Sequence, residues 1–115
     1  MEWKESFKHD IKTKINHADI EYKKYKKDDK LIYLQQACEK MYSAVENFLM
    51  IKYETRAHSY QQLYYRVLAN DKDSALLSSA QMLHEFFYNG EIKMLRTDAD
   101  RVYNSVRDRL KTRLR

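Results

Sequence analysis

The residue types best suited to metal or nucleophilic chemistry are few in this sequence, which has four histidines and one cysteine. No HExxH motif occurs, and no Cys/His pair has the spacing of a zinc site. His17 and Glu21 are four residues apart and share a helix face, but a structural metal site needs more ligands. Cys38 lies on an apolar stripe with no sign of a nearby base, which predicts a small buried side chain rather than a catalytic thiol. The sequence therefore predicts no metal site, no cofactor and no catalytic residue.

Polar residues that suit anion binding open a predicted helix at Arg56-Ala57-His58-Ser59-Tyr60. Helix N-termini present free N–H groups and the positive end of the helix dipole. Arg56 and His58 would add donors there, with Tyr60 beside them. These three residues are a candidate ligand-binding site for a phosphate or nucleotide, and the alternative is a helix cap within an interface cluster.

The last twenty residues carry most of the net charge of +5. Residues 96–115 hold seven Lys/Arg against three Asp/Glu, a net charge of +4. Arg107, Lys111 and Arg115 are spaced four apart, so they form a stripe on one helix face. This stripe is a candidate nucleic-acid-binding site. The alternative is a solvated helix end whose cations complement the dipole.

His84 and Tyr88 are also four residues apart, and their neighbours Leu83 and Phe87 have the apolar character of core residues. The spacing predicts a structural polar network that is buried, in which the imidazole N–H and the phenol O–H satisfy one another.

Helices must position these residues, because the sequence has no proline and one glycine, Gly90. Sandwiches, barrels and the loops of α/β folds need frequent turn residues. An apolar content of 43% excludes a disordered chain of low hydrophobicity, and a length of 115 residues indicates one domain, 1–115. We therefore expect an all-α, up-and-down antiparallel bundle of four to five helices joined by short links.

Apolar residues at helical spacing predict helices over 3–26, 30–53, 57–70, 74–89 and 98–113. The apolar stripe over 30–53 is the widest, so we expect that helix to be the most buried. Residues 91–96 fit either a helical turn or a loop.

Turn-forming residues predict how these helices begin and end. Asp28 or Asp29 is expected to cap the second helix, and Asp71 or Asp73 the fourth. Asn89-Gly90 is expected to end the fourth helix, because both residues tolerate the left-handed conformation. Thr97 and Asp100 resemble a capping box for the last helix.

Two segments carry a resemblance to a known superfamily. The run Ala37-Cys38-Glu39-Lys40-Met41-Tyr42-Ser43-Ala44 resembles the AxEKxxxA segment of HEPN-type helical domains. Leu83-His84, followed by Phe87-Tyr88, resembles the LHxxFY segment of archaeal paralogous-repeat families placed near that superfamily. The resemblance spans about residues 10–112 and implies a bundle of four to five helices that is often a homodimer.

The same resemblance bears on function, because HEPN-type domains include RNases of toxin–antitoxin and defence systems as well as non-catalytic nucleotide- or RNA-binding members. The RNase motif of the family is an Arg followed, after four to six residues, by a His. None of the four histidines here has an Arg at that distance before it. The resemblance therefore favours a non-catalytic member.

Three functions follow as hypotheses. The first is a non-catalytic HEPN-like dimer that binds nucleic acid or a nucleotide. The second is a protein-interaction, antitoxin-like module, in which some of the ten tyrosines form an interface with a partner or a second copy. The third is an RNase with a non-standard residue set around Arg56, His58 and Tyr60.

Localisation follows from the same composition. One cysteine cannot form an internal disulfide, which fits a reducing compartment. The first residues lack the apolar core of a signal peptide, and the longest apolar run is far short of a membrane span. We expect a cytoplasmic protein with no membrane partner.

Overall fold

The computed structural model describes residues 2–57 and 59–115, and within these ranges every regular element is a helix. The elements are α1 (Glu2–Asp28), α2 (Leu31–Lys52), α3 (Tyr60–Val67), α4 (Asp71–Asn89), the 3-10 turn η1 (Gly90–Ile92) and α5 (Arg96–Arg113). The prediction of an all-α protein is confirmed. Among these helices none is long and apolar enough to cross a membrane.

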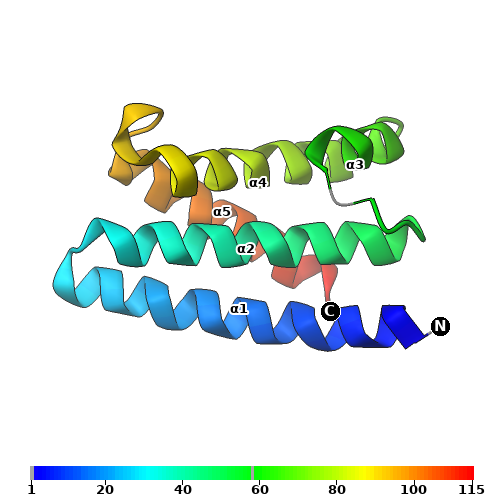
Figure 1. Cartoon of the computed structure of the whole chain (residues 1–115), viewed down its shortest axis with the longest axis horizontal. Coiled ribbons are helices and arrows are strands. Elements are labelled where there is room, and N and C mark those ends of the chain that lie inside the picture. Colours follow the sequence, from blue (N-terminus) through cyan, green and yellow to red (C-terminus); the bar gives the residue numbers. More distant parts are fainter. Residues whose placement is uncertain (1, 58) are drawn as a thin grey trace.

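The three long helices α1, α2 and α4 lie side by side and alternate in direction (Figure 1). A short link cannot span the length of a helix, so the next helix must start near the end of the previous one and run back antiparallel to it. Helix α5 passes behind α2 at an angle and packs against both α2 and α4. The up-and-down arrangement therefore holds for α1, α2 and α4, whereas α5 crosses this layer obliquely and covers one of its faces.

The core is centred on α2, as its wide apolar stripe predicts. Its buried residues are Leu34, Ala37, Cys38, Met41, Tyr42, Ala44, Val45, Asn47, Leu49 and Met50. Cys38 is fully buried, which confirms the expected packing role, and burial raises the pKa of its thiol well above the usual value. On α5, Tyr103 is completely buried, whereas the neighbouring Val102 is partly buried and packs against the core.

The link between α1 and α2 is shorter than predicted. Helix α1 continues through Asp28, so only Asp29 and Lys30 connect the helices. The prediction that Asp28 or Asp29 caps α2 is wrong, because the N-cap residue is Lys30, without a side-chain hydrogen bond. Asp29 has a φ of 54°. Aspartate tolerates this left-handed conformation, which lets the chain reverse within two residues.

The caps of α3 and α4 also differ from the prediction. Helix α3 begins at Tyr60 rather than residue 57, because the hydroxyl of Ser59 accepts a hydrogen bond from the Gln62 N–H and caps the helix there. Helix α4 begins at Asp71 and is capped by Asn70, so neither Asp71 nor Asp73 is the cap. Both aspartates stand in the first turn, where the helix dipole favours negative charge.

At the last connection, Gly90 has a φ of 58° and ends α4, as predicted, while Asn89 remains within the helix. The turn η1 follows, and α5 begins at Arg96 with Leu95 as N-cap. The predicted capping box of Thr97 and Asp100 does not form. Asp100 instead accepts hydrogen bonds from α1, as described below.

Candidate nucleic-acid interface

Cationic side chains from two helices line a groove of about 370 Å³ between α1 and the end of α5. Its lining residues are Lys12, Ile15, Asn16, Lys111, Leu114 and Arg115. Lys12, Lys111 and Arg115 are exposed, and none of the lining residues is a carboxylate. The groove therefore presents three cations and, within the described part of the chain, no lining anion.

Helix periodicity explains why these cations meet. On α1, Ile11 and Ile15 are buried, so Lys12 lies at the border between core and solvent. On α5, Leu110 is buried and Lys111 follows it at the corresponding border. Both apolar stripes face the same core, which brings the two lysines to one groove from opposite ends of the sequence.

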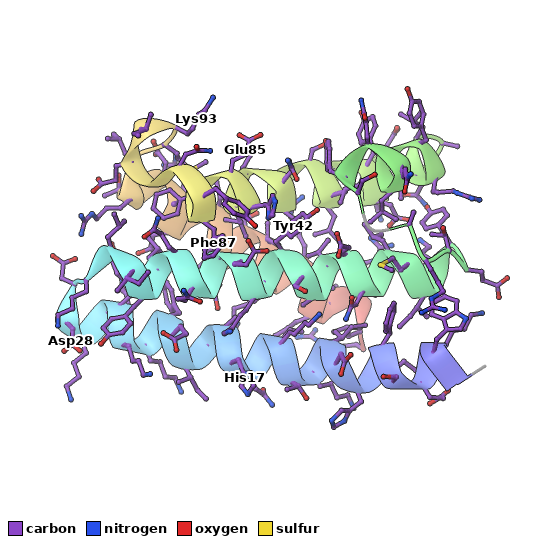
Figure 2. All side chains as sticks on the ribbon, in the orientation of Figure 1. His17, Asp28, Tyr42, Glu85, Phe87 and Lys93 are labelled. Atoms are coloured by element: carbon purple, nitrogen blue, oxygen red, sulfur yellow. The ribbon has the colours of Figure 1, made fainter. Side chains whose placement is uncertain are left out.

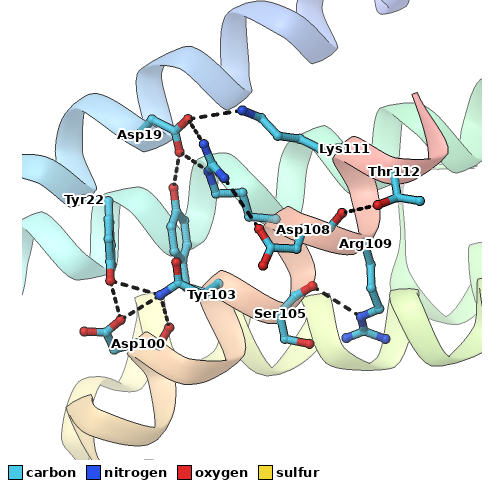
Figure 3. A network of polar contacts seen from close by, with 11 residues as sticks. Asp19, Tyr22, Asp100, Tyr103, Ser105, Asp108, Arg109, Lys111 and Thr112 are labelled. Carbon is cyan, nitrogen blue, oxygen red and sulfur yellow. Dashed lines mark hydrogen bonds and ion pairs between the residues drawn. The ribbon is translucent and has the colours of Figure 1, made fainter. Parts of the chain in front are cut away.

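Arg107, the first member of the predicted stripe, forms an ion pair with Asp19 of α1 (Figure 3). Its Nε donates to Oδ1 of Asp19 at 2.7 Å and its Nη2 donates to Oδ2 at 2.9 Å. Lys111 Nζ lies 4.0 Å from the same carboxylate, at the limit of an ion pair. The structure therefore separates the predicted set, because Arg107 is held by Asp19 whereas Lys111 and Arg115 line the groove.

Tyrosines strengthen this contact between α1 and α5. The Tyr103 hydroxyl donates to Oδ1 of Asp19 at 3.0 Å, and the Tyr103 ring stacks on Tyr22 with 4.7 Å between ring centroids. The Tyr22 hydroxyl donates to Asp100 at 2.6 Å, and Asn104 donates to both (Figure 3). These contacts fix the rotation of α5 about its axis and so place Lys111 on the side of α1.

A buried carboxylate, that of Asp73 in the first turn of α4, holds the end of α5. Asp73 is completely buried, and its carboxylate accepts hydrogen bonds from Lys52 at 2.7 Å, from Tyr53 and from Arg113. The Arg113 guanidinium also lies over the Phe48 ring, 5.3 Å from its centroid. Arg113 stands between Lys111 and Arg115, so Asp73 anchors the turn that carries the groove cations.

Asp19 and Asp73 make the stability of the fold sensitive to acid. Burial would raise the pKa of each carboxyl, but hydrogen bonds from Arg107 to Asp19, and from Lys52, Tyr53 and Arg113 to Asp73, outweigh it, so both pKa values lie below the usual 3.8. Each carboxyl thus binds a proton more weakly in the folded state than in the unfolded state. The stability that it contributes is present above its unfolded pKa and is lost as the pH falls through its folded pKa.

We expect the melting temperature to stay nearly constant from pH 7 to about pH 5 and to fall below about pH 4. Thermal unfolding followed by circular dichroism over this range measures it. The Asp73→Asn variant, which cannot titrate at this position, should lose less stability over the acid range than the wild type. An equal loss in the two proteins would assign the acid sensitivity to other groups.

On its opposite side, the end of α5 borders a second cleft, of about 450 Å³, against the start of α4. Lys72, Arg109 and Arg113 line it together with Asp108 and uncharged residues. Arg113 is already paired with Asp73, which leaves Lys72 and Arg109 as the other cations of this cleft. Basic side chains thus flank the last turns of α5 on both sides.

The predicted ligand site of Arg56, His58 and Tyr60 is only partly described, because His58 lies outside the described residues. The Arg56 guanidinium lies 6.0 Å from the centroid of the Trp3 ring on α1. The Tyr60 hydroxyl lies 3.5 Å from the Ser78 hydroxyl on α4. Arg56 and Tyr60 therefore contact different helices, and Ser59 caps the N-terminus of α3 that the prediction assigned to an anion.

His84 belongs to a polar cluster, but its hydrogen-bond partner differs from the predicted one. Its Nδ1 lies 3.0 Å from a carboxylate oxygen of Glu39, and its ring stacks on Tyr42 with 4.4 Å between centroids. Tyr88 contacts the His84 ring edge-on at 4.9 Å and is 69% exposed. Glu39 is thus the hydrogen-bond partner of His84, in place of the predicted Tyr88.

Sequence reasoning missed Lys12, Asp19 and Asp73 as residues of or around this interface. The first two lie on α1, about ninety residues before the α5 side chains that they meet. No local pattern marks such pairs, since only packing of the helices brings them together. Among the described residues, no group of three or more His, Cys, Asp or Glu side chains could hold a metal ion.

Comparison with known proteins gives no match: no protein-family model, no curated protein and no solved structure matches this chain. The described residues define its class by structure alone, as an all-α protein of five helices whose last helix borders a cationic groove.

Proposed function

We propose that this chain is a non-catalytic, HEPN-like helical protein that binds nucleic acid, and that it acts as a homodimer. The observation that carries the proposal is the groove between α1 and α5, where Lys12, Lys111 and Arg115 gather and where no carboxylate side chain is among the described lining residues. Surface cations of this kind bind the phosphates of nucleic acids independently of sequence. A free nucleotide offers the same phosphate chemistry and is the second ligand to test.

The contacts around the groove support this assignment of roles. Arg107 is neutralised by Asp19, so it positions α5 rather than meeting a phosphate. Lys111, whose Nζ lies 4.0 Å from the Asp19 carboxylate, and Arg115 are both exposed. The absence of an Arg four to six residues before any His supports binding rather than cleavage.

Fluorescence anisotropy with labelled single-stranded and duplex RNA at about 50 and 200 mM salt tests the proposal. Three phosphate contacts give a slope of roughly −2 in the logarithm of the affinity against the logarithm of the salt concentration for a single strand, so the fourfold rise in salt should weaken binding roughly 20-fold. No RNA binding at the lower salt concentration, or an RNA affinity that does not change with the salt concentration, would contradict the proposal.

Exposed apolar side chains favour a second candidate function, that of a protein-interaction, antitoxin-like module. Tyr88, Ile92 and Leu95 lie within eight residues of one another and are 69%, 89% and 62% exposed. Large exposed apolar groups of this kind often mark protein contacts. Light scattering that shows a dimer, together with no RNA binding at low salt, would favour this function over the first.

A further inference from the structure

A pocket of about 310 Å³ is lined by residues of α2 and α4 and by the start of α3. Tyr42 marks its position between α2 and α4 (Figure 2). The side chains that give the pocket its chemistry are Glu39, Tyr42, Glu46, Tyr60, Gln81 and His84. Within the described residues no Lys or Arg lines it, in contrast to the α1/α5 groove.

The carboxylates of the pocket come from one side of α2. Glu39 and Glu46 are seven residues apart, which places them two turns apart on the same helix face. The Tyr42 hydroxyl, between them, donates to Glu46 at 3.2 Å. Burial and the nearby Glu46 carboxylate raise the pKa of Tyr42, so the phenol remains neutral and keeps the proton that it donates to Glu46.

Aromatic rings form the walls between these carboxylates. His84 stacks on Tyr42 with an interplanar angle of 29°, and Tyr60 reaches the pocket from α3. The faces of the Tyr42 and Tyr60 rings carry negative partial charge and attract ammonium and guanidinium groups, whereas His84 contacts the Glu39 carboxylate through its Nδ1 at 3.0 Å. Rings and carboxylates together therefore favour an organic cation over a neutral or anionic ligand.

Gln81 supplies the third feature of the pocket, a side-chain oxygen that can accept a hydrogen bond from a ligand. Its Oε1 atom is buried and has no hydrogen-bond partner among the described residues, although the side chain lines the pocket. Leaving a buried acceptor unpaired is unfavourable, because the atom loses its hydrogen bonds to water without gaining another. A bound N–H donor would relieve this penalty.

We propose that this pocket binds an organic cation, a primary ammonium or a guanidinium group, with Glu39 and Glu46 neutralising its charge and Gln81 accepting one of its N–H groups. Two sources offer this chemistry: a free polyamine, and a Lys or Arg side chain from a second copy of this Lys/Arg-rich chain. The inference does not rest on nucleic-acid binding, because the pocket shares no lining residue with the α1/α5 groove.

Titration of the full chain with spermidine, followed by two-dimensional ¹H–¹⁵N NMR, tests the site. We expect saturable shifts of amides in the segments 39–46, 59–60 and 78–84, and no such set of shifts with sodium chloride at the same ionic strength. Gln81→Leu and Glu46→Gln should each weaken spermidine binding by about tenfold, since each removes one polar contact to the cation.

Glu85→Gln is the matched control, because Glu85 is an exposed carboxylate on α4 that does not line the pocket (Figure 2). It makes the same change in net charge as Glu46→Gln and should leave spermidine affinity within about twofold. Equal losses in the two variants, or shifts that sodium chloride reproduces, would overturn the proposal by showing only general charge attraction. Absence of saturation up to tens of millimolar spermidine would overturn it as well.

Light scattering with and without saturating spermidine separates the two sources. A dimer that dissociates when spermidine occupies the pocket identifies a side chain of the second copy as the natural cation. An oligomeric state that spermidine does not change supports a free organic cation. Both outcomes require the saturable shifts described above.

Discussion

Replacing Asp73 with Ala is expected to lower the free energy of unfolding by about 3 kcal/mol, the lower end of the range for removing one partner of a buried ion pair. The carboxylate is completely buried and accepts hydrogen bonds from Lys52, Tyr53 and Arg113. Without this carboxylate, the ammonium group of Lys52 and the guanidinium group of Arg113 lose their shared counter-ion. The lower end applies because the Lys52 and Arg113 side chains are 38% and 24% exposed, so water still reaches them. Chemical denaturation measures the change.

Asp71→Ala is the matched control for this prediction, since Asp71 is an exposed aspartate in the same first turn of α4. It should cost no more than about 1 kcal/mol, the contribution of a charge to the helix dipole. Equal losses for the two variants would show that the dipole, rather than the buried cluster, accounts for the effect of Asp73. Asp73→Asn, which keeps the shape and removes the charge, should fall between wild type and Asp73→Ala.

The Asp73 cluster also links stability to the proposed function. Arg113 follows Lys111 by two residues, so its contact with Asp73 fixes the last turn of α5 against α4 and α2. Asp19 fixes the preceding turn against α1 through Arg107. Lys111 and Arg115, which neither carboxylate holds firmly, line the groove.

Properties that depend on local sequence were predictable. Apolar residues at helical spacing predicted five helices, the central position of α2 and the burial of Cys38, because one apolar stripe can be buried only by packing. Gly90 was predictable as the end of α4, since its φ of 58° is one that glycine adopts without a steric penalty. Cap residues were less predictable, because several polar residues compete at each helix start.

Properties that depend on tertiary packing were not predictable. Asp73 has the sequence context of a cap, and only the approach of Lys52 and Arg113 from two other helices makes it a buried anion. In the same way, the sequence predicts that Arg107, Lys111 and Arg115 form one continuous basic stripe on a helix face. The structure divides it, because Asp19 on α1 lies opposite Arg107.

Reversing the three groove charges, by Lys12→Glu, Lys111→Glu and Arg115→Glu in one variant, is expected to weaken RNA binding by at least about 100-fold at 50 mM salt. This factor corresponds to about 2.7 kcal/mol, or somewhat under 1 kcal/mol for each lost phosphate contact. The salt dependence should flatten as well, because the slope counts the phosphates that the protein neutralises. The anisotropy titration described above measures both quantities.

Lys27→Glu, Lys30→Glu and Lys93→Glu in one variant form the matched control, since these lysines are exposed and line none of the grooves described above. Both variants change the net charge from +5 by −6, to −1. If the groove binds phosphates, the control should lose less than about tenfold in affinity and keep most of its salt slope, because surface charges beyond a Debye length are largely screened. Similar losses in both variants would mean that net charge attracts the RNA, and the groove would then have no specific role.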